Sequence, residues 1–401
     1  MTESLSRRQS IRNIGLLTAV QALMGSSSTI IMTVAALAAI NFAPDPSLAT
    51  VPVTTMVIGL AVTTSVATRL IYRLGRSRGL ILGTFIAIPA ALLASLGVIL
   101  ANFYLFSLGT FLTGASGAFA QQIRFAAADS VAPDLKSRAI SWVLFGGIAA
   151  GFFGPQASSI TRNWIPGSQY AASFLVIVVL AVASIAILSQ TRLAPTAVAN
   201  AAGGGRPLSV LLRQPEIFLP MLGASVTYSL MTLLMVAAPL AMVYICGHSP
   251  DAASSAIQWH VVAMFAPSFV TGTIIRYLGS YLVTAIGLVL IIICAAIALS
   301  GISVAHFHLT LILLGLGWNF GFIGSTTMLA TAYRPEEAAR VQAVNEQIVF
   351  GVTAIASIGS GLLLQLVGWQ AINILAIPLA AVTIALLAWG SLRRPAISVA
   401  Q

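Results

Sequence analysis

Twelve long apolar runs constrain this chain more than any other feature of its sequence. A run of about 20 apolar residues is the length that an α-helix needs to cross the hydrocarbon core of a bilayer. The runs are continuous rather than alternating, which argues against membrane-spanning strands. We therefore predict an all-α membrane protein with twelve transmembrane helices. They cover roughly residues 14–40, 49–71, 79–100, 103–125, 139–160, 170–189, 217–243, 254–277, 281–300, 308–332, 344–367 and 370–391.

One long connection divides the twelve runs six and six. It reads "QTRLAPTAVANAAGGGRPLSVLLRQPE" and is rich in Ala, Gly and Pro, a composition typical of a flexible linker. We expect a short surface helix at its end. The sequence thus predicts three parts: an N-terminal six-helix half (1–189), a cytoplasmic linker (190–216) and a C-terminal six-helix half (217–401).

The charged residues predict the orientation of the chain. There are 19 basic and 9 acidic residues, giving a formal net charge of +10. If both termini are cytoplasmic, every basic residue except Arg162 falls on the cytoplasmic side, as expected for membrane proteins. The arginine-rich run "RLIYRLGRSRG" (69–79) is then a cytoplasmic loop rather than a nucleic-acid patch. Trp164 and Trp369 fall at the outer face, where we expect them to anchor the chain at the membrane interface.

The two halves resemble each other in sequence. "TRLIYRLGRSRGLILG" (68–83) aligns with "GTIIRYLGSYLVTAIG" (272–287), which pairs Gly75 with Gly279. "PDLKSR" (133–138) aligns with "PEEAAR" (335–340) at nearly the same offset. Each aligned pair occupies the same place in its half, so we predict duplicated halves. Parallel repeats of this kind place a substrate site between the halves, near the middle of the membrane.

These features together resemble the major facilitator superfamily over nearly the whole chain. That family has a basic loop of the pattern Gly-x-Leu-x-Asp-Arg-x-Gly-Arg-Arg between its second and third helices, and Tyr72 replaces the acid here. The resemblance implies transport by alternating access, with a cavity lined mainly by spans 1, 4, 7 and 10. Without the acid, another anion must pair with the arginines. The loop residues that fit the pattern are Leu70, Arg73, Gly75, Arg76 and Arg78.

Two other family motifs match only in part. The fifth span, "GGIAAGFFGPQASS" (146–159), keeps Gly154 and Pro155 of the pattern found in antiporters. This match favours export with antiport, and the alternative is a glycine-rich packing face. The fourth span has Thr110 where the family usually carries a proton-linked arginine. Arg124 lies about four turns closer to the cytoplasm.

Few ionisable residues fall within the predicted spans, and each is therefore a functional candidate. Glu346 is either a proton-coupling carboxylate or, as we prefer, a gate latch that faces arginines of the other half. We expect Asp129 to act similarly within the first half. His260 would protonate near neutral pH, or it is a buried neutral histidine. The candidate partners of Glu346 are Arg73, Arg76 and Arg124.

The spans that the resemblance places around the cavity supply the candidates for substrate contact. Trp318 and Asn319 would stack on a planar solute and hydrogen-bond its edge. The alternative for this pair is packing and hydrogen bonding between helices. The full set of candidates is Gln21, Ser27, Gln121, Gln122, Tyr228, Thr232, Trp318, Asn319 and Phe322.

The sequence favours a transporter over an enzyme. It has no phosphate-binding loop, metal-ligand cluster or nucleophile elbow, so we expect no cofactor and no metal. We predict a secondary transporter of a small organic molecule, with proton-coupled export as the main function. Uptake of a nutrient or vitamin-like compound is the alternative, and a channel or a membrane receptor is the alternative from another class. We expect a monomer in the bacterial inner membrane, in contact with the lipid bilayer and without nucleic acid.

Overall fold

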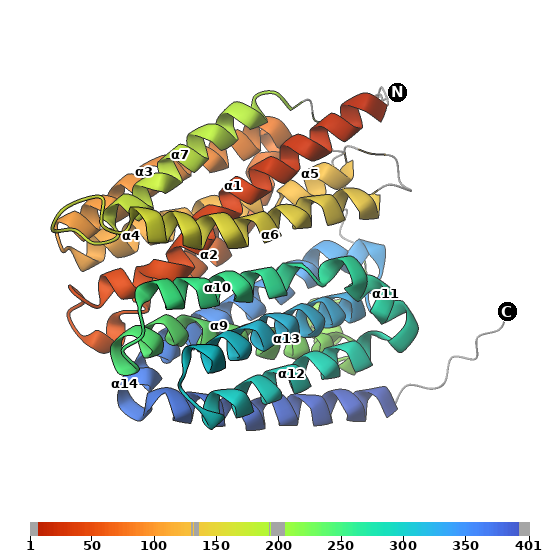
Figure 1. Cartoon of the computed structure of the whole chain (residues 1–401). Helices are drawn as coiled ribbons and strands as arrows, with labels where there is room; N and C mark the ends of the chain where they lie inside the picture. Colours follow the sequence, from red (N-terminus) through yellow and green to blue (C-terminus); the bar gives the residue numbers. More distant parts are fainter. Residues whose placement is uncertain (1–6, 130, 132–135, 192, 194–204, 393–401) are drawn as a thin grey trace.

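The computed structural model describes residues 7–129, 131, 136–191, 193 and 205–392. Its long helices run side by side in two groups (Figure 1). The first group contains α1 (Arg7–Ala39), α2 (Val51–Leu74), α3 (Arg76–Ile99), α4 (Phe103–Ala120), α5 (Ile123–Asp129), α6 (Lys136–Thr161) and α7 (Ala171–Leu188). The second contains α9 (Pro215–Leu240), α10 (Pro250–Phe265), α11 (Ser268–Leu278), α12 (Ser280–Ser300), α13 (Val304–Ala330) and α14 (Ala338–Leu392).

These helices confirm the prediction of an all-α membrane protein. Among the described residues, nine helices are long and apolar enough to cross a membrane, or ten if α10 and α11 form one span. The 55-residue helix α14 contains two predicted spans, because Gly368 interrupts it with a φ of 79°. The 26-residue helix α6 covers the predicted span 139–160.

Two predicted spans are broken rather than continuous. The helices α10 and α11 meet at an angle of 46° at Ala266 and Pro267. A proline removes one backbone hydrogen bond of a helix and clashes with the preceding turn, which explains the bend. The predicted span 103–125 is divided by a turn at Gln121 and Gln122 into α4 and α5. Our expectation of one straight helix was wrong for residues 254–277, whereas residues 103–127 together form one candidate span, as predicted.

The predicted repeat has a counterpart in the backbone. Gly75 joins α2 to α3 with φ 85° and ψ 156°, and Gly279 joins α11 to α12 with φ 80° and ψ 153°. Residues with a side chain rarely adopt this conformation, so glycine is required at both joints. The segment 132–135 of the other predicted repeat lies outside the described residues, whereas its counterpart forms the turn Pro335–Glu337 and the start of α14.

The two groups of helices approach each other at one end of the molecule. We call this the loop end; the opposite end, where α1, α3, α6, α9, α12 and α14 begin, is the arginine-rich end. The helix α6 packs against α10, and α2 packs against α14. The ribbons of the two groups diverge toward the arginine-rich end (Figure 1). Most buried residues of α2 lie between Pro52 and Gly59, near the loop end, which agrees with this divergence.

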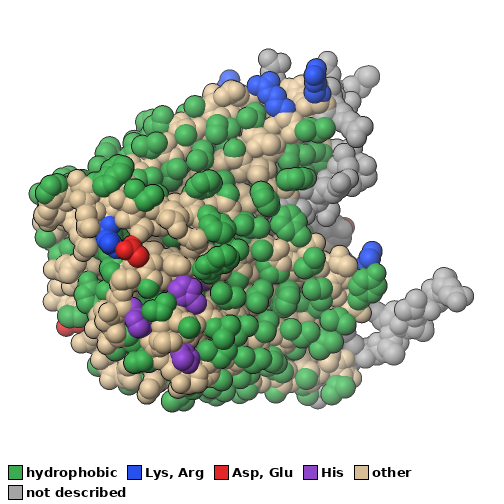
Figure 2. Space-filling view, in the orientation of Figure 1, with side chains coloured by type: hydrophobic (Ala, Val, Ile, Leu, Met, Phe, Trp, Pro, Cys, Tyr) green, Lys and Arg blue, Asp and Glu red, His purple; other side chains and the backbone are tan. Residues whose placement is uncertain are grey.

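Nearly all of the described arginines lie at one end of the molecule, whereas one of the two tryptophans expected at the membrane interface is buried. Among the described arginines, only Arg162 lies at the loop end. Figure 2 shows hydrophobic side chains over most of the visible face, as a bilayer requires. Trp164 is 66% exposed at the loop end, but Trp369 is only 5% exposed. Its ring packs 5.2 Å from that of Phe307, so our expectation that Trp369 anchors the membrane interface was wrong.

The end of the predicted linker is fastened to the second half. Glu337 is fully buried, and its carboxylate accepts hydrogen bonds from Nε and Nη2 of Arg206 at 2.8 and 2.7 Å. The backbone N–H groups of Arg206 and Arg334 donate to the same carboxylate. The hydrogen bonds from the Arg206 side chain are the main reason that the pKa of Glu337 is lowered. The expected surface helix is α8 (Leu208–Leu211), and its Leu211 packs among Ile217 and other residues of the second half.

Candidate functional site

Five aromatic side chains of the second half converge between its helices. Trp318 and Phe322 of α13 are one turn apart, and their rings stack with centroids 5.2 Å apart. Tyr228 of α9 meets both rings edge-on, at 5.5 and 5.3 Å. It also lies 5.7 Å from the ring of Phe350 on α14, and Phe265 of α10 lies 6.2 Å from Trp318. We call Tyr228, Phe265, Trp318, Phe322 and Phe350 the aromatic cluster.

The aromatic cluster contains a polar atom without a partner. The indole N–H of Trp318 is buried and has no hydrogen-bond acceptor among the described residues. A buried tryptophan N–H usually has a partner, and an unpaired one destabilises the fold. An acceptor on a bound molecule or a water would satisfy it. The cluster therefore has the two properties of a site for a planar solute, which are flat apolar faces and a directed donor.

The hydrogen-bond partners of Asn319 differ from the solute contact that we predicted for it beside Trp318. It is fully buried, and its amide nitrogen donates to the carbonyl of Met264 at 2.6 Å and to the hydroxyl of Ser268 at 2.8 Å. Its amide oxygen accepts from the hydroxyl of Thr271 at 2.6 Å. These partners flank the bend between α10 and α11. The contacts favour the alternative of hydrogen bonding between helices, and they fasten α13 to the bend.

One positive and one negative charge from opposite halves lie beside the aromatic cluster. Arg124 of α5 interacts electrostatically with Glu346 of α14 and with the hydroxyl of Tyr228. Glu346 precedes Phe350 by one helical turn, which places it on the same face of α14. Of the three arginines that we considered as partners, Arg124 is the one whose charge interacts with Glu346, although the two side chains form no ion pair or hydrogen bond. Arg73 lies exposed on the end of α2.

The remaining predicted site residues are spread over both halves. Gln122 donates to the hydroxyl of Thr68 at 3.2 Å, and Gln121 is half-buried in the same turn. Thr232 is buried one turn beyond Tyr228. His260 is fully buried, with Nδ1 2.8 Å from the carbonyl oxygen of Leu311, which fits the alternative of a buried histidine.

Several predicted residues belong to the interior of the first half. Ser27 lines a small pocket enclosed by helices of that half, together with Thr84 and Thr113. Gln21 lies on α1 where α1 meets Gly146 of α6. The side chain of Asp129 lies outside the described residues, and Arg76 is buried at the start of α3. The described residues contain no group of three His, Cys, Asp or Glu side chains that would hold a metal ion.

Gly154 and Pro155 lie where α6 packs against α1. A side chain at Gly154 would overlap Thr29, whose hydroxyl donates to the carbonyl of Ala150 at 3.0 Å. Both residues thus lie in a close helix contact within the first half. This geometry fits the packing alternative for the partial antiporter motif.

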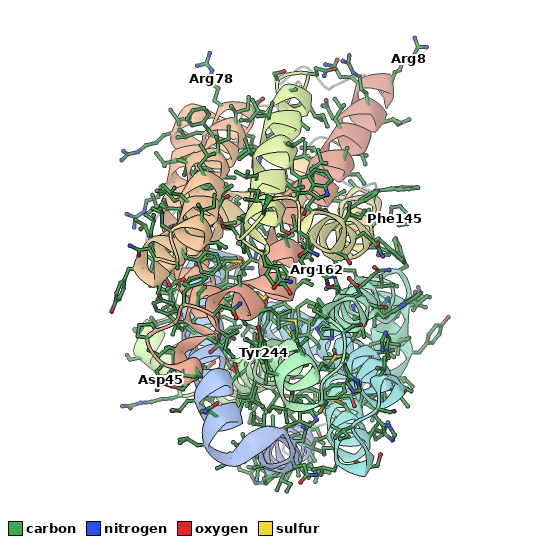
Figure 3. All side chains as sticks on the ribbon, turned by 60° about the vertical axis from the view of Figure 1, so that its left-hand side comes forward. Arg8, Asp45, Arg78, Phe145, Arg162 and Tyr244 are labelled. Atoms are coloured by element: carbon green, nitrogen blue, oxygen red, sulfur yellow. The ribbon has the colours of Figure 1, made fainter. Side chains whose placement is uncertain are left out.

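Polar contacts between the halves close the loop end. Arg162 pairs with Asp251 at 3.1 Å, and the hydroxyl of Ser159 donates to the same carboxylate. Nearer the middle, Gln156 donates to Gln258 at 2.9 Å. Figure 3 shows Arg162 and Tyr244 near the junction of the halves, with Arg8 and Arg78 projecting from the far end of the first half. The two halves are therefore joined by polar contacts toward the loop end, while their ribbons diverge toward the arginine-rich end.

Removing the loop-end ion pair should favour opening there only modestly. An exposed pair contributes about 0–1 kcal/mol, so Arg162→Gln should shift the population by no more than about fivefold. Spin labels at positions 169 and 300, in a chain lacking Cys246 and Cys294, would measure this as a longer distance between the halves. The matched control is Arg78→Gln, at an exposed arginine of the other end. Equal label distances in the native protein and both variants would show that the Arg162–Asp251 pair does not hold the loop end closed.

The same labels test a pH dependence. The hydroxyl of Ser159 and then Arg162 lower the pKa of Asp251. Its contribution to closure is present above the ordinary carboxyl pKa of about 4 and is lost as the pH falls through the lowered value. The label distance should therefore stay constant from about pH 5 to about pH 8.

Comparison with known proteins decides the family. A sequence model of the Major Facilitator Superfamily matches residues 17–352. The chain belongs to the major facilitator superfamily. It is therefore a multi-pass membrane transporter rather than an enzyme. A solved structure, that of a bacterial homologue of the iron transporter ferroportin in its outward-facing state, shares the fold. Its TM-score is 0.64 at 16% identity, and the match covers 95% of this chain and 100% of that chain.

Two relatives differ widely in their similarity to this chain. The "Riboflavin transporter RfnT" of Brucella anthropi is 42% identical over 389 residues, which is 96% of each protein. The "Uncharacterized MFS-type transporter YdeG" of Bacillus subtilis is 25% identical over 379 residues, covering 89% of this chain and 87% of the relative.

Proposed function

We propose that this chain transports riboflavin or a closely related flavin into the cell. The observation that carries the proposal is the 42% identity to a riboflavin transporter along nearly the full length of both proteins. Uptake of a vitamin-like compound was our alternative function. The relative supports it better than proton-coupled export, our main prediction, which relied on the partial motif at Gly154 and Pro155.

The candidate site suits this substrate chemically. Riboflavin carries a flat, uncharged three-ring isoalloxazine system with a polar edge and a ribityl chain of hydroxyl groups. The faces of Trp318 and Phe322 offer stacking surface, and the indole N–H of Trp318 offers a donor to a carbonyl of the ring edge. Arg124 and Glu346 offer polar partners for the hydroxyl groups. Glu346 is also our candidate for proton coupling.

The location of the protein is part of the proposal. The arginine-rich end carries nearly all of the described positive charges, which supports placing it in the cytoplasm with both chain termini. In that orientation the contacts between the halves at the loop end lie toward the outside. We place the protein in the bacterial inner membrane as a monomer.

Reconstituted protein should accumulate radiolabelled riboflavin inside proteoliposomes. Unlabelled riboflavin should abolish the signal, and liposomes without protein give the background. Imposing a proton gradient, and then collapsing it with an uncoupler, separates coupled uptake from facilitated diffusion. Failure to take up riboflavin with or without the gradient, in protein shown to be folded, would overturn the proposal.

A further inference from the structure

Arg124 and Glu346 bring one positive and one negative charge to the candidate site. They come from opposite halves, and both lie next to members of the aromatic cluster. Arg124 interacts with Tyr228, and Glu346 is one turn from Phe350. The Nε atom of Arg124 is buried and has no acceptor among the described residues, so the guanidinium retains capacity for a ligand. Together the two side chains add no net charge to the site.

Other charges on the described helices around the site lie at helix ends. A buried charge without a partner is costly, so a charged ligand requires a countercharge nearby. Apart from the pair, the described part of these helices supplies none near the cluster. The charged residues with described side chains on α9, α10, α13 and α14, which carry the aromatic cluster, are Glu216, Asp251 and Arg340 besides Glu346.

We propose that the Arg124–Glu346 pair makes the site selective for neutral flavins and excludes flavins that carry a phosphate. This inference rests on the proposed function and names the residues that set its specificity. The charge of Glu346 offsets that of Arg124 within the site, so a phosphate dianion would gain little net attraction there. It would also be repelled by Glu346, and it would lose its hydration on entering the site. A neutral ribityl chain meets neither cost and hydrogen-bonds to both partners.

Binding competition on purified protein tests the proposal without requiring transport. Quenching of riboflavin fluorescence measures the affinity of the protein for riboflavin. In the competition experiment, riboflavin 5′-phosphate is added to protein with bound radiolabelled riboflavin, and the displaced radiolabel is measured. In the native protein the phosphate ester should compete poorly. In Glu346→Gln the site gains a net positive charge, and competition by the ester relative to riboflavin should improve at least about tenfold. The double variant Arg124→Gln/Glu346→Gln restores neutrality and should again exclude the ester.

A second single variant keeps the test informative if Glu346→Gln does not fold. Arg124→Gln leaves a net negative charge, so it should gain affinity for a flavin with an aminoalkyl side chain and none for the phosphate ester. If native protein binds riboflavin but also binds the ester equally well, or if neither single variant changes its preference, the charge filter is wrong and the proposed function stands. If native protein does not bind riboflavin, the proposed function itself fails.

Discussion

Replacing Trp318 with alanine should weaken riboflavin binding by about tenfold to a hundredfold. Stacking of a flat ring on an aromatic side chain contributes about 1–3 kcal/mol, and the substitution also removes the unpaired indole N–H. Trp318 also forms the stacked pair with Phe322 and contacts Tyr228 and Phe265, so its loss opens the aromatic cluster. Titration of purified protein with riboflavin, followed by fluorescence quenching, measures the change in Kd.

Two further variants make this result specific. Trp318→Phe keeps the stacking face and loses only the donor, so its loss of affinity should be clearly smaller. Trp164→Ala removes an exposed indole at the loop end and should leave the Kd unchanged. If Trp318→Ala binds riboflavin as the native protein does, the aromatic cluster is not the binding site, whatever the outcome of the uptake experiment.

Replacing Asn319 with leucine should lower transport far more than it lowers affinity. The change removes the hydrogen bonds to the carbonyl of Met264 and to the hydroxyls of Ser268 and Thr271, of which Thr271 keeps a bond to the carbonyl of Pro267. Unpaired buried groups cost about 2–4 kcal/mol in total here, so the melting temperature should fall. Without these bonds, α13 no longer controls the bend between α10 and α11. We therefore expect the maximal uptake rate to fall more than tenfold, with a nearly unchanged Kd for riboflavin.

A matched control lies on the same helix. The hydroxyl of Thr326 bonds only to carbonyls of α13 itself, so Thr326→Val should preserve both stability and rate. Rates are compared at temperatures equally far below each melting point, which separates a hinge defect from simple instability. A normal rate under that condition would show that Asn319 serves stability alone.

The sequence predicted most of the fold because its physical basis is local. A helix that crosses a bilayer must be apolar over a fixed length, and this requirement appears directly in the chain. The conformations of Gly75 and Gly279 follow from the glycine requirement at the two matched joints. The breaks at Gln121–Gln122 and at Pro267 were not predicted, because the apolar pattern continues through both. Prolines are tolerated within transmembrane helices, so Pro267 alone does not reveal a bend.

The candidate site was predictable only in part, because its members meet through tertiary packing. Trp318 and Tyr228 were identified from their amphipathic character, and Phe322 from its place one turn after Trp318, in spans expected to line the cavity. Phe265 and Phe350 were missed, because a phenylalanine in an apolar run looks the same whether it faces lipid or a ligand. The spacing of Phe350 one turn after Glu346 was the available signal.

Neighbours in sequence also proved to have different surroundings. Trp318 and Asn319 differ by about 100° around their helix, so one faces the aromatic cluster while the other faces the bend between α10 and α11. Sequence placed Glu346 and Arg124 in the same region of the membrane. Only the structure distinguished Arg124 from the other arginines as its partner.

Because Arg206 is bonded to Glu337, the second half begins near Gly205 rather than at the predicted residue 217. Residues from Gly205 onward travel with the second half, so the segment that separates the two moving bodies is shorter than the composition suggests. Fluorescent proteins or affinity tags are best inserted among residues 194–204, before this anchor. Two coexpressed fragments divided there would each keep their contacts, whereas a division after Arg206 would strip the second fragment of the partner for its buried carboxylate.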